Sequence, residues 1–216
     1  MDKAVYLKIE SYMLSCMEDS AHDAEHIYRV LGLANRLSRG VDEAVDSDVL
    51  TAACLLHDIG RAEQFKDPKV CHAEAGSKKA YAFLLELGWS EERAAHVRDC
   101  VLTHRFRNDR RPQTMEAKLL FDADKLDVSG AMGIARTLCY AGEMGYPLYT
   151  RDETGVLLEP TGDAPNTFVQ EYRHKLEKIG GGLYTEEARN IAAQRLSAAS
   201  AFYKSLLAEI RESLKS

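Results

Sequence analysis

The chain has 216 residues, of which 45% are hydrophobic and 29% charged, proportions typical of a globular protein with a substantial core. Its net charge of -6 argues against a platform for duplex nucleic acid, which normally needs a basic surface. An anionic small molecule remains compatible, because local cations or a metal ion can outweigh a mildly acidic whole.

The N-terminal residues predict neither a leader nor a membrane anchor. They begin MDKAVYLKIESYM, which includes acids and lacks a basic start followed by an apolar run. No stretch in the chain approaches the roughly 18 apolar residues of a membrane span. The five cysteines show no CxxC spacing, and Cys54 and Cys100 lie on apolar helical stripes. This pattern indicates buried free thiols in a reducing compartment. We therefore expect a cytoplasmic protein.

Histidines lie on the apolar faces of the helices predicted for the first part of the chain. After a helix over residues 5–17, a second helix places His26 on the face of its core residues. A third, strongly apolar helix ends in the adjacent pair His57 and Asp58, followed by Gly60. An imidazole beside a carboxylate suits a divalent cation, although a packed histidine next to a capping aspartate would also explain the pair alone.

Two further histidines occupy inward positions in the next two predicted helices. Residues 61–70 are expected to form a charged connection. His72 then begins the apolar stripe of a helix that ends at Gly88. Ser90 opens the following helix, whose apolar stripe ends in His104.

Three aspartates share the helix that is predicted to start at Thr114. Projection at 100° per residue places Asp127 near the centre of the apolar face and Asp124 on its flank, while Asp122 points away. Acids on the inner half of an apolar helix are costly unless they are paired or bound to a metal. Asp124 is therefore a candidate ligand.

The second part of the chain predicts further helices separated by one long loop. Residues 142–165 contain three of the five prolines and are expected to be the least ordered segment, near the mouth of the site or at a subunit contact. Helices follow over residues 166–214, and we find no repeat and no convincing strand. The predicted fold class is all-α, with one domain over residues 1–216, a core at about 20–140, and the C-terminal helices packed on it.

The inward polar groups favour a metal site over ordinary packing. They comprise four histidines and two aspartates on core stripes: His26, His57, Asp58, His72, His104 and Asp124. One buried histidine in a domain needs no explanation, but this many polar groups on apolar faces must meet partners, and a shared metal ion satisfies several at once.

The motifs around these residues resemble a known family. HDAEHIYRV, LLHDIGR, HAEAG, THRF and FDADKLDVSGAMGIART are similar, in order and spacing, to the HD-domain superfamily of metal-dependent phosphohydrolases, and especially to a bacterial subgroup of stand-alone HD hydrolases. The resemblance covers roughly residues 20–210. It implies an HD-type helical bundle with metal ligands at His26, His57, Asp58 and Asp124. It also implies that His72 and His104 hold a second metal or contact phosphate.

Phosphate chemistry adds expectations about catalysis and substrate binding. Asp58 can both ligate the metal and steer or deprotonate the attacking water. Cations must offset the charge of the transition state, and five candidates lie close to the proposed ligands in sequence: Arg29, Lys125, Arg61, Arg105 and Arg107. Arg61 and Arg107 could equally be solvated surface charges. Lys125 stands where the subgroup would have arginine, and Arg105 stands where a small polar residue is usual, a change that bears on the substrate.

The sequence thus predicts a metal-dependent phosphohydrolase acting on a small phosphorylated molecule, expected to be a nucleotide. The favoured reaction converts a nucleoside triphosphate into a monophosphate and pyrophosphate. A phosphomonoesterase or 5′-nucleotidase, a phosphodiesterase, and a non-catalytic nucleotide-sensing module are the alternatives. The implied cofactor is a divalent ion (Mn²⁺, Mg²⁺, Fe²⁺, Co²⁺ or Ni²⁺). Neither duplex nucleic acid nor a membrane is an expected partner, and a homodimer is left open.

Overall fold

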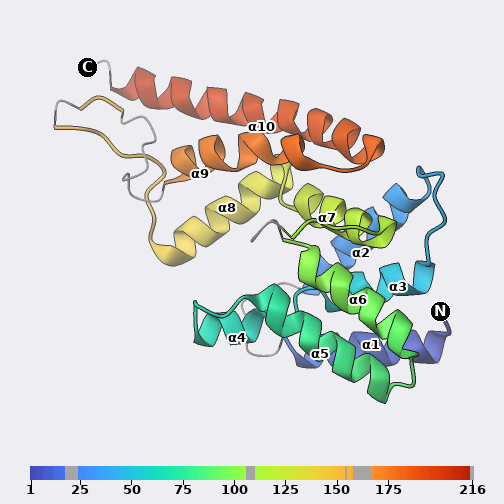
Figure 1. The fold of residues 1–216 in the computed structure, drawn as a ribbon. Helices are drawn as coiled ribbons and strands as arrows, with labels where there is room; N and C mark the ends of the chain where they lie inside the picture. The colour runs from blue at the N-terminus through green and yellow to red at the C-terminus, as the bar shows by residue number, and fades with distance from the viewer. Residues whose placement is uncertain (18–23, 106–109, 154, 158–166, 215–216) are drawn as a thin grey trace. The chain divides into compact units, whose positions relative to one another are not determined.

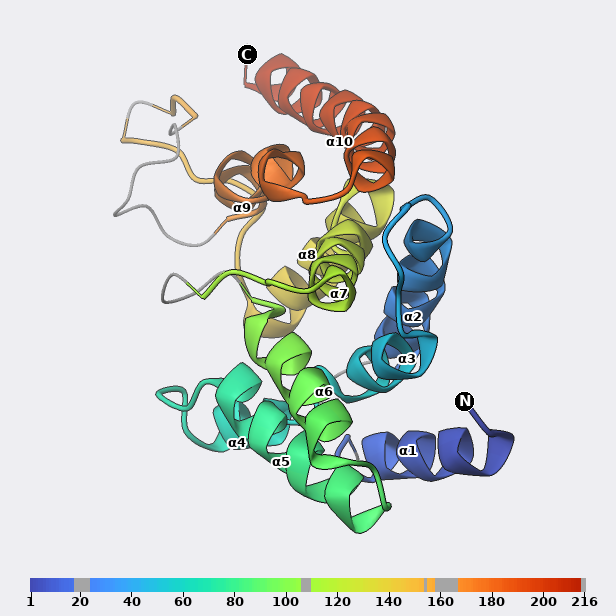
Figure 2. The same ribbon diagram turned by 45° about the vertical axis from the view of Figure 1, so that its right-hand side comes forward.

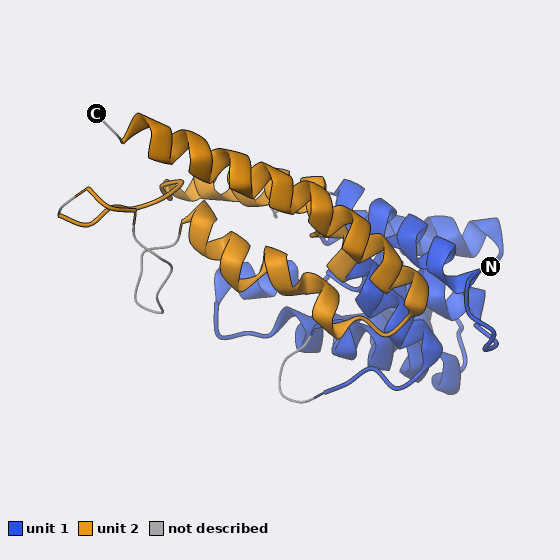
Figure 3. Cartoon of the chain, turned by 90° about the horizontal axis from the view of Figure 1, so that it is seen from above, with its two compact units in different colours: residues 1–124 blue, residues 125–216 orange. Residues whose placement is uncertain are grey.

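The computed structural model of the chain describes residues 1–17, 24–105, 110–153, 155–157 and 167–214. These residues form α-helices, one 3₁₀-helix and an isolated β-bridge between Arg151 and Leu157, so the predicted all-α class is confirmed (Figure 1). Within the same residues, no helix has the length and apolar character needed to cross a bilayer. The chain separates into two compact units, residues 1–124 and residues 125–216 (Figure 3). The single-domain organisation stays a prediction.

The first unit is built from short helices with well-defined starts. They are α1 (Lys3–Ser15), α2 (Ala24–Ser38), α3 (Ser47–Leu56), α4 (Arg61–Lys66), α5 (His72–Glu86), α6 (Glu91–Thr103) and most of α7 (Met115–Asp127). The Asp46 carboxylate accepts the backbone N–H groups of Asp48 and Val49 and so begins α3. The Ser90 hydroxyl begins α6 in the same way, as predicted.

Helix α3 lies at the centre of this unit. It contacts α1, α2, α5 and α6, while α5 runs alongside α6 (Figures 1 and 2). Most of its side chains, including Cys54, are fully buried, and Cys100 of α6 is buried as well. All five cysteines are free thiols. Because the last five residues of α3, Ala52–Leu56, are all apolar and buried, its C-terminal end, where His57 and Asp58 follow, lies inside the unit.

Two glycines allow the end of α3 to approach α5 closely. A Cβ added at Gly60 would lie 2.5 Å from the backbone nitrogen of Gly76 and would also meet the His72 carbonyl oxygen. Any larger residue at position 60 must therefore push the two backbones apart. Since Asp58 lies two residues before Gly60, and His72 begins α5 and takes part in the contact through its carbonyl oxygen, the contact sets the separation of Asp58 and His72.

Replacement of Gly60 by alanine is expected to lower the free energy of unfolding by about 3 kcal/mol, because the methyl group meets backbone that cannot rotate away. The matched control is Gly32→Ala in α2, where nothing lies within 4 Å of the added methyl group. That change should stabilise the protein by about 0.5–1 kcal/mol through helix propensity. Urea denaturation of both variants provides the measurement, and equal effects would contradict the close-contact explanation.

Two expectations for the first unit were wrong. Residues 61–70 include the helix α4, which lies within the expected charged connection. Asp122 does not point away into solvent, because its side chain is fully buried. The physical reason is that α7 is buried on nearly all sides, so it has no single solvent face for an outward residue to occupy.

The second unit has its own apolar core. Its elements after α7 are α8 (Gly130–Met144), α9 (Phe168–His174), the 3₁₀-helix η1 (Leu176–Gly182) and α10 (Glu186–Ser213), the last capped by Thr185 as predicted. Within that core Tyr172 of α9 stacks on Tyr203 of α10, with ring centroids 3.9 Å apart.

The long loop starts three residues later than predicted, because α8 continues to Met144. Helix α8 is terminated by Gly145, which adopts a left-handed conformation with a φ of 68°. Residues 154 and 158–166 of the predicted loop lie outside the described residues.

Candidate metal centre

Four proposed ligands meet inside the first unit. His26 comes from the first turn of α2, His57 and Asp58 follow the last residue of α3, and Asp124 lies in α7. The two imidazole Nε2 atoms, of His26 and His57, are 3.3 Å apart. Oδ2 of Asp58 lies 3.8 Å from the first of these nitrogens and 3.7 Å from the second. Oδ1 of Asp124 lies 3.4 Å and 4.0 Å from the same two atoms.

The other oxygen of Asp58 faces a second group of histidines. Oδ1 of Asp58 is 3.3 Å from Nε2 of His72 and 3.6 Å from Nε2 of His104, and these two nitrogens are 3.3 Å apart. Asp58 therefore stands between two clusters, with one carboxylate oxygen directed at each. Every sequence-predicted histidine and both aspartates are thus brought together, and all six side chains are buried.

The ends of two helices fix the imidazole tautomers. Nδ1 of His57 lies 2.8 Å from the carbonyl oxygen of Cys54, and Nδ1 of His104 lies 2.6 Å from that of Val101. These carbonyls belong to the last turns of α3 and α6, where they lack partners within the helix. A carbonyl only accepts, so each Nδ1 carries the proton. Each Nε2 is then unprotonated, with its lone pair directed at Asp58.

Burial of two imidazoles and the charges around Asp58 give these three groups the protonation states that a metal ligand needs. Burial lowers the pKa of His57 to about 4, so its imidazole is neutral at pH 7. Burial lowers the pKa of His72 to about 2. Burial by itself would raise the pKa of Asp58, but His57, Arg61 and His104 outweigh it and hold this pKa well below its usual value. Asp58 is therefore an anion beside the neutral rings of His57 and His72.

The donor set fits a divalent cation. Ligand bonds of about 2.0–2.2 Å to nitrogen and oxygen leave neighbouring donor atoms about 3–3.5 Å apart. The separations of 3.3–4.0 Å in the first cluster are close to this spacing. Two neutral imidazoles and two carboxylates match the mixed nitrogen and oxygen preference of Mn²⁺, Fe²⁺, Co²⁺ or Zn²⁺. The residues present therefore fit a metal ion.

Two of the predicted cations lie at the second cluster. Nε of Arg61, the first residue of α4, is 3.0 Å from Oδ1 of Asp58. The Arg105 guanidinium is 3.1 Å from Nδ1 of His72. The Arg61 side chain is 28% exposed, so it can reach a ligand that enters from solvent.

Gln64 is a site residue that the sequence did not reveal. Its side-chain oxygen lies 2.6 Å from Nδ1 of His72, from one turn beyond Arg61 in α4. A glutamine in a stretch that reads as a charged connection gives no signal of such a contact. The other predicted cations stay predictions: Arg29 is half-buried one turn after His26, and Lys125 follows Asp124 in the sequence. Arg107 lies outside the described residues.

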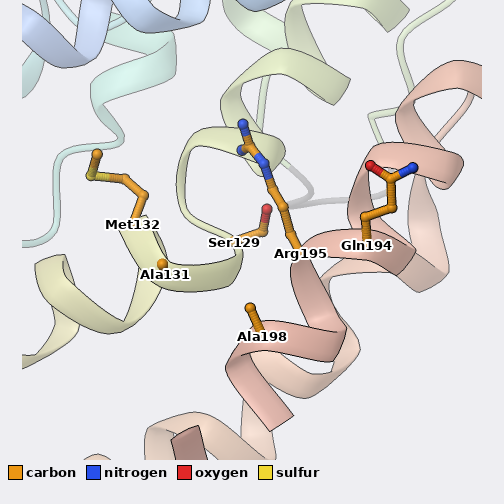
Figure 4. Close-up of a pocket in the computed structure, with 6 residues that line it drawn as sticks. All are labelled: Ser129, Ala131, Met132, Gln194, Arg195 and Ala198. Atoms are coloured by element: carbon orange, nitrogen blue, oxygen red, sulfur yellow. The ribbon is translucent and has the colours of Figure 1, made fainter. Parts of the chain in front are cut away.

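A cavity elsewhere does not offer comparable chemistry. It has a volume of about 390 Å³, lies in the second unit, and is lined by side chains from the start of α8 and from α10 (Figure 4). Arg195, the charged residue of its lining, donates to the carbonyl oxygen of Leu126. The lining contains no histidine and no acid. Among the described residues, the clusters around Asp58 are the candidate site.

Comparisons with known proteins relate this chain to the HD domain family. A model of the HD domain family matches residues 23–129. Uncharacterized protein YpgQ of Bacillus subtilis (strain 168) is 30% identical over 182 residues, which cover 82% of this chain and 79% of that protein. Two solved structures are similar along almost their whole length. The structure of Bacillus subtilis YpgQ in complex with ADP has a TM-score of 0.71 and 27% identity, with 95% of this chain and 97% of that one covered. An HD-superfamily hydrolase from Bacillus thuringiensis has a TM-score of 0.74 and 29% identity, with coverage of 96% and 97%.

Proposed function

The chain belongs to the HD domain family, and from this premise we propose that it is a metal-dependent phosphohydrolase acting on a nucleotide. The proposal takes residues 1–216 as one hydrolase domain. The observation that carries it is the convergence of His26, His57, Asp58 and Asp124, whose ligand atoms lie 3.3–4.0 Å from their neighbours. We assign these four residues as ligands of one divalent ion. The bound ion would polarise a phosphoryl oxygen and acidify a water molecule.

The residues around this ion would accept a proton from the attacking water and bind the phosphate oxygens. Asp58 is ionised at neutral pH, so its carboxylate can accept hydrogen bonds from a water molecule and receive its proton. Arg61 lies beside Asp58 and is partly exposed, which suits it to bind phosphate oxygens as negative charge develops. Arg105 adds a second guanidinium next to His72. We assign Arg29, Lys125 and Arg107 to phosphate contacts on their sequence positions alone.

A nucleotide is the substrate class that the relatives favour. The Bacillus subtilis relative was crystallised with ADP, a molecule with two linked phosphoryl groups. Paired guanidinium groups at the edge of the site suit a chain of phosphates better than one phosphate ester, since each can neutralise a separate phosphoryl group. We therefore favour cleavage of a nucleoside triphosphate to monophosphate and pyrophosphate over removal of a terminal phosphate.

Product analysis on a nucleotide panel tests this reaction. The Mn²⁺-loaded protein is expected to release pyrophosphate from nucleoside triphosphates and little inorganic phosphate from monophosphates. Addition of a chelator should remove this turnover, and restored Mn²⁺ should recover it. Release of orthophosphate from nucleoside monophosphates would favour the phosphomonoesterase instead. Nucleotide binding without turnover under any of the five implied ions would indicate the sensing module.

A further inference from the structure

Helix α4 presents an exposed aromatic ring beside the candidate site. Phe65 is 75% exposed, the largest value among the large hydrophobic residues of the described chain. A phenyl ring gains free energy when a ligand covers it, so a ring left this open offers binding area. Phe65 follows Arg61 by four positions, which is one turn of the same helix.

The contacts of α4 define which of its faces is directed at the site. Arg61 and Gln64 each contact the second cluster, at 3.0 Å and 2.6 Å. Glu63 lies on the other side of the helix, where its carboxylate accepts a hydrogen bond from Nζ of Lys79 in α5. At 100° per residue, Phe65 lies about 40° from Arg61 and about 160° from Glu63 around the helix. The ring therefore shares the face of Arg61 and points away from the side packed on α5.

This arrangement suits the two ends of a nucleotide. Arg61 is the partly exposed guanidinium assigned to phosphate oxygens. Side chains one helical turn apart have Cβ atoms about 5–6 Å from each other, and both of these side chains are long. One sugar separates the phosphates of a nucleotide from its base, so a nucleotide held at Arg61 brings its base within reach of the Phe65 ring.

We propose that Phe65 is the base-binding residue of this protein, and that the base of a nucleotide held at Arg61 stacks on its ring. This inference rests on the proposed function, because it takes Arg61 as a phosphate contact. Stacking needs only a π-face, which every base has. The ring therefore selects nucleotides over phosphoanhydrides that lack a base, and it does not select one base over another.

Kinetics on paired substrates provide the first test. Phe65→Ala is expected to raise the KM for ATP by about 10-fold and to leave kcat unchanged, because the stack is as strong in the ground state as in the transition state. The rise should be similar for GTP, CTP and UTP. Phe65→Leu, which has no π-face, should also raise KM, whereas Phe65→Trp should keep it low. Inorganic tripolyphosphate has no base, so it should bind the wild type and these variants equally, as a substrate or as a competitive inhibitor.

The matched control is Leu7→Ala, which removes an exposed large hydrophobic side chain of α1. It should leave the KM for ATP and the binding of tripolyphosphate unchanged. If Phe65→Ala weakened ATP and tripolyphosphate equally, or weakened neither, the inference would be overturned. It would also be overturned if Phe65→Ala lowered the oligomeric state in analytical ultracentrifugation without a change in KM, since the ring would then belong to a contact between subunits.

Fluorescence tests the stack without turnover. The single tryptophan of the chain, Trp89, lies beyond the C-terminal end of α5, whereas His72 begins that helix. In a protein that combines Trp89→Phe with Phe65→Trp, the new indole is the reporter. ADP with Mg²⁺ should quench its emission, tripolyphosphate should not, and ADP should leave the emission of the wild type unchanged.

The fluorescence outcomes separate this inference from the proposed hydrolysis. Absence of quenching by ADP, or equal quenching by tripolyphosphate, would overturn the role of Phe65 while the proposed hydrolysis stands. If the wild type instead cleaved no phosphate compound with any of the five implied ions, the proposed hydrolysis would fail. Quenching by ADP would still decide whether a base stacks at position 65.

Discussion

Replacement of Asp58 by alanine is expected to abolish both metal retention and nucleotide hydrolysis. Asp58 directs one carboxylate oxygen at His26 and His57 and the other at His72 and His104, so its loss removes the anion that both clusters share. Loss of a residue that merely orients a ligand costs about 10–100-fold in metal affinity, and loss of a ligand should exceed that range. Elemental analysis after desalting and a pyrophosphate-release assay measure the two effects.

The control for this change is Asp42→Ala, which removes an exposed aspartate of the same unit. It should leave metal content and turnover at their wild-type values. If Asp58→Ala retained as much metal as the wild type, metal binding would not depend on the carboxylate between the clusters. That result would contradict the assigned ligand set.

The second large effect separates two aspartates that lie two residues apart in α7. Asp124→Ala is expected to lose the bound ion, because its Oδ1 lies 3.4 Å from Nε2 of His26 within the first cluster. Asp122→Ala is expected to keep the ion but to lose about 3 kcal/mol of folding free energy, since a fully buried carboxyl group that other groups engage is removed. Asp124→Ala should therefore lose metal binding, whereas Asp122→Ala should lose folding stability.

Both properties can be measured on the same samples. Metal content is determined by elemental analysis, and the free energy of unfolding of the metal-free protein is obtained from urea denaturation. If Asp122→Ala lost the ion and Asp124→Ala kept it, the ligand would be the wrong aspartate of the pair. If both kept it, neither Asp122 nor Asp124 would be a ligand.

Helical periodicity was sufficient to predict that the six polar groups converge. Side chains on the core faces of several helices must meet inside the unit, so an inward His26 and an inward His57 are brought together by the burial of their apolar neighbours. The pattern could not say which oxygen of Asp58 faces which histidines, because that depends on the turn after α3 and on the Gly60 contact with Gly76. Those are tertiary contacts without a periodic signal.

Two sequence-based errors have physical causes of the same kind. Helix α4 has six residues and no apolar stripe, and its position is secured by side-chain contacts such as that of Glu63 with Lys79 at 2.8 Å. A segment so short is held by its neighbours and not by its own propensity. Asp122 was placed outward because projection assumes one solvent face, and α7 has none in the region of Asp122.

The ligands proposed for the ion are distant in sequence, and this distance bears on the order of folding. Bringing His26 to Asp124 closes a loop of roughly 100 residues, which costs an unfolded chain about 4 kcal/mol of conformational entropy. We therefore expect the metal ion to be a poorer nucleus for collapse than an ion whose ligands are a few residues apart. Burial of the apolar helix α3 is expected to come first, so that the ion binds a chain that is already folded. Its contribution to stability then follows mass action, about 2.7 kcal/mol at a free concentration one hundred times its dissociation constant.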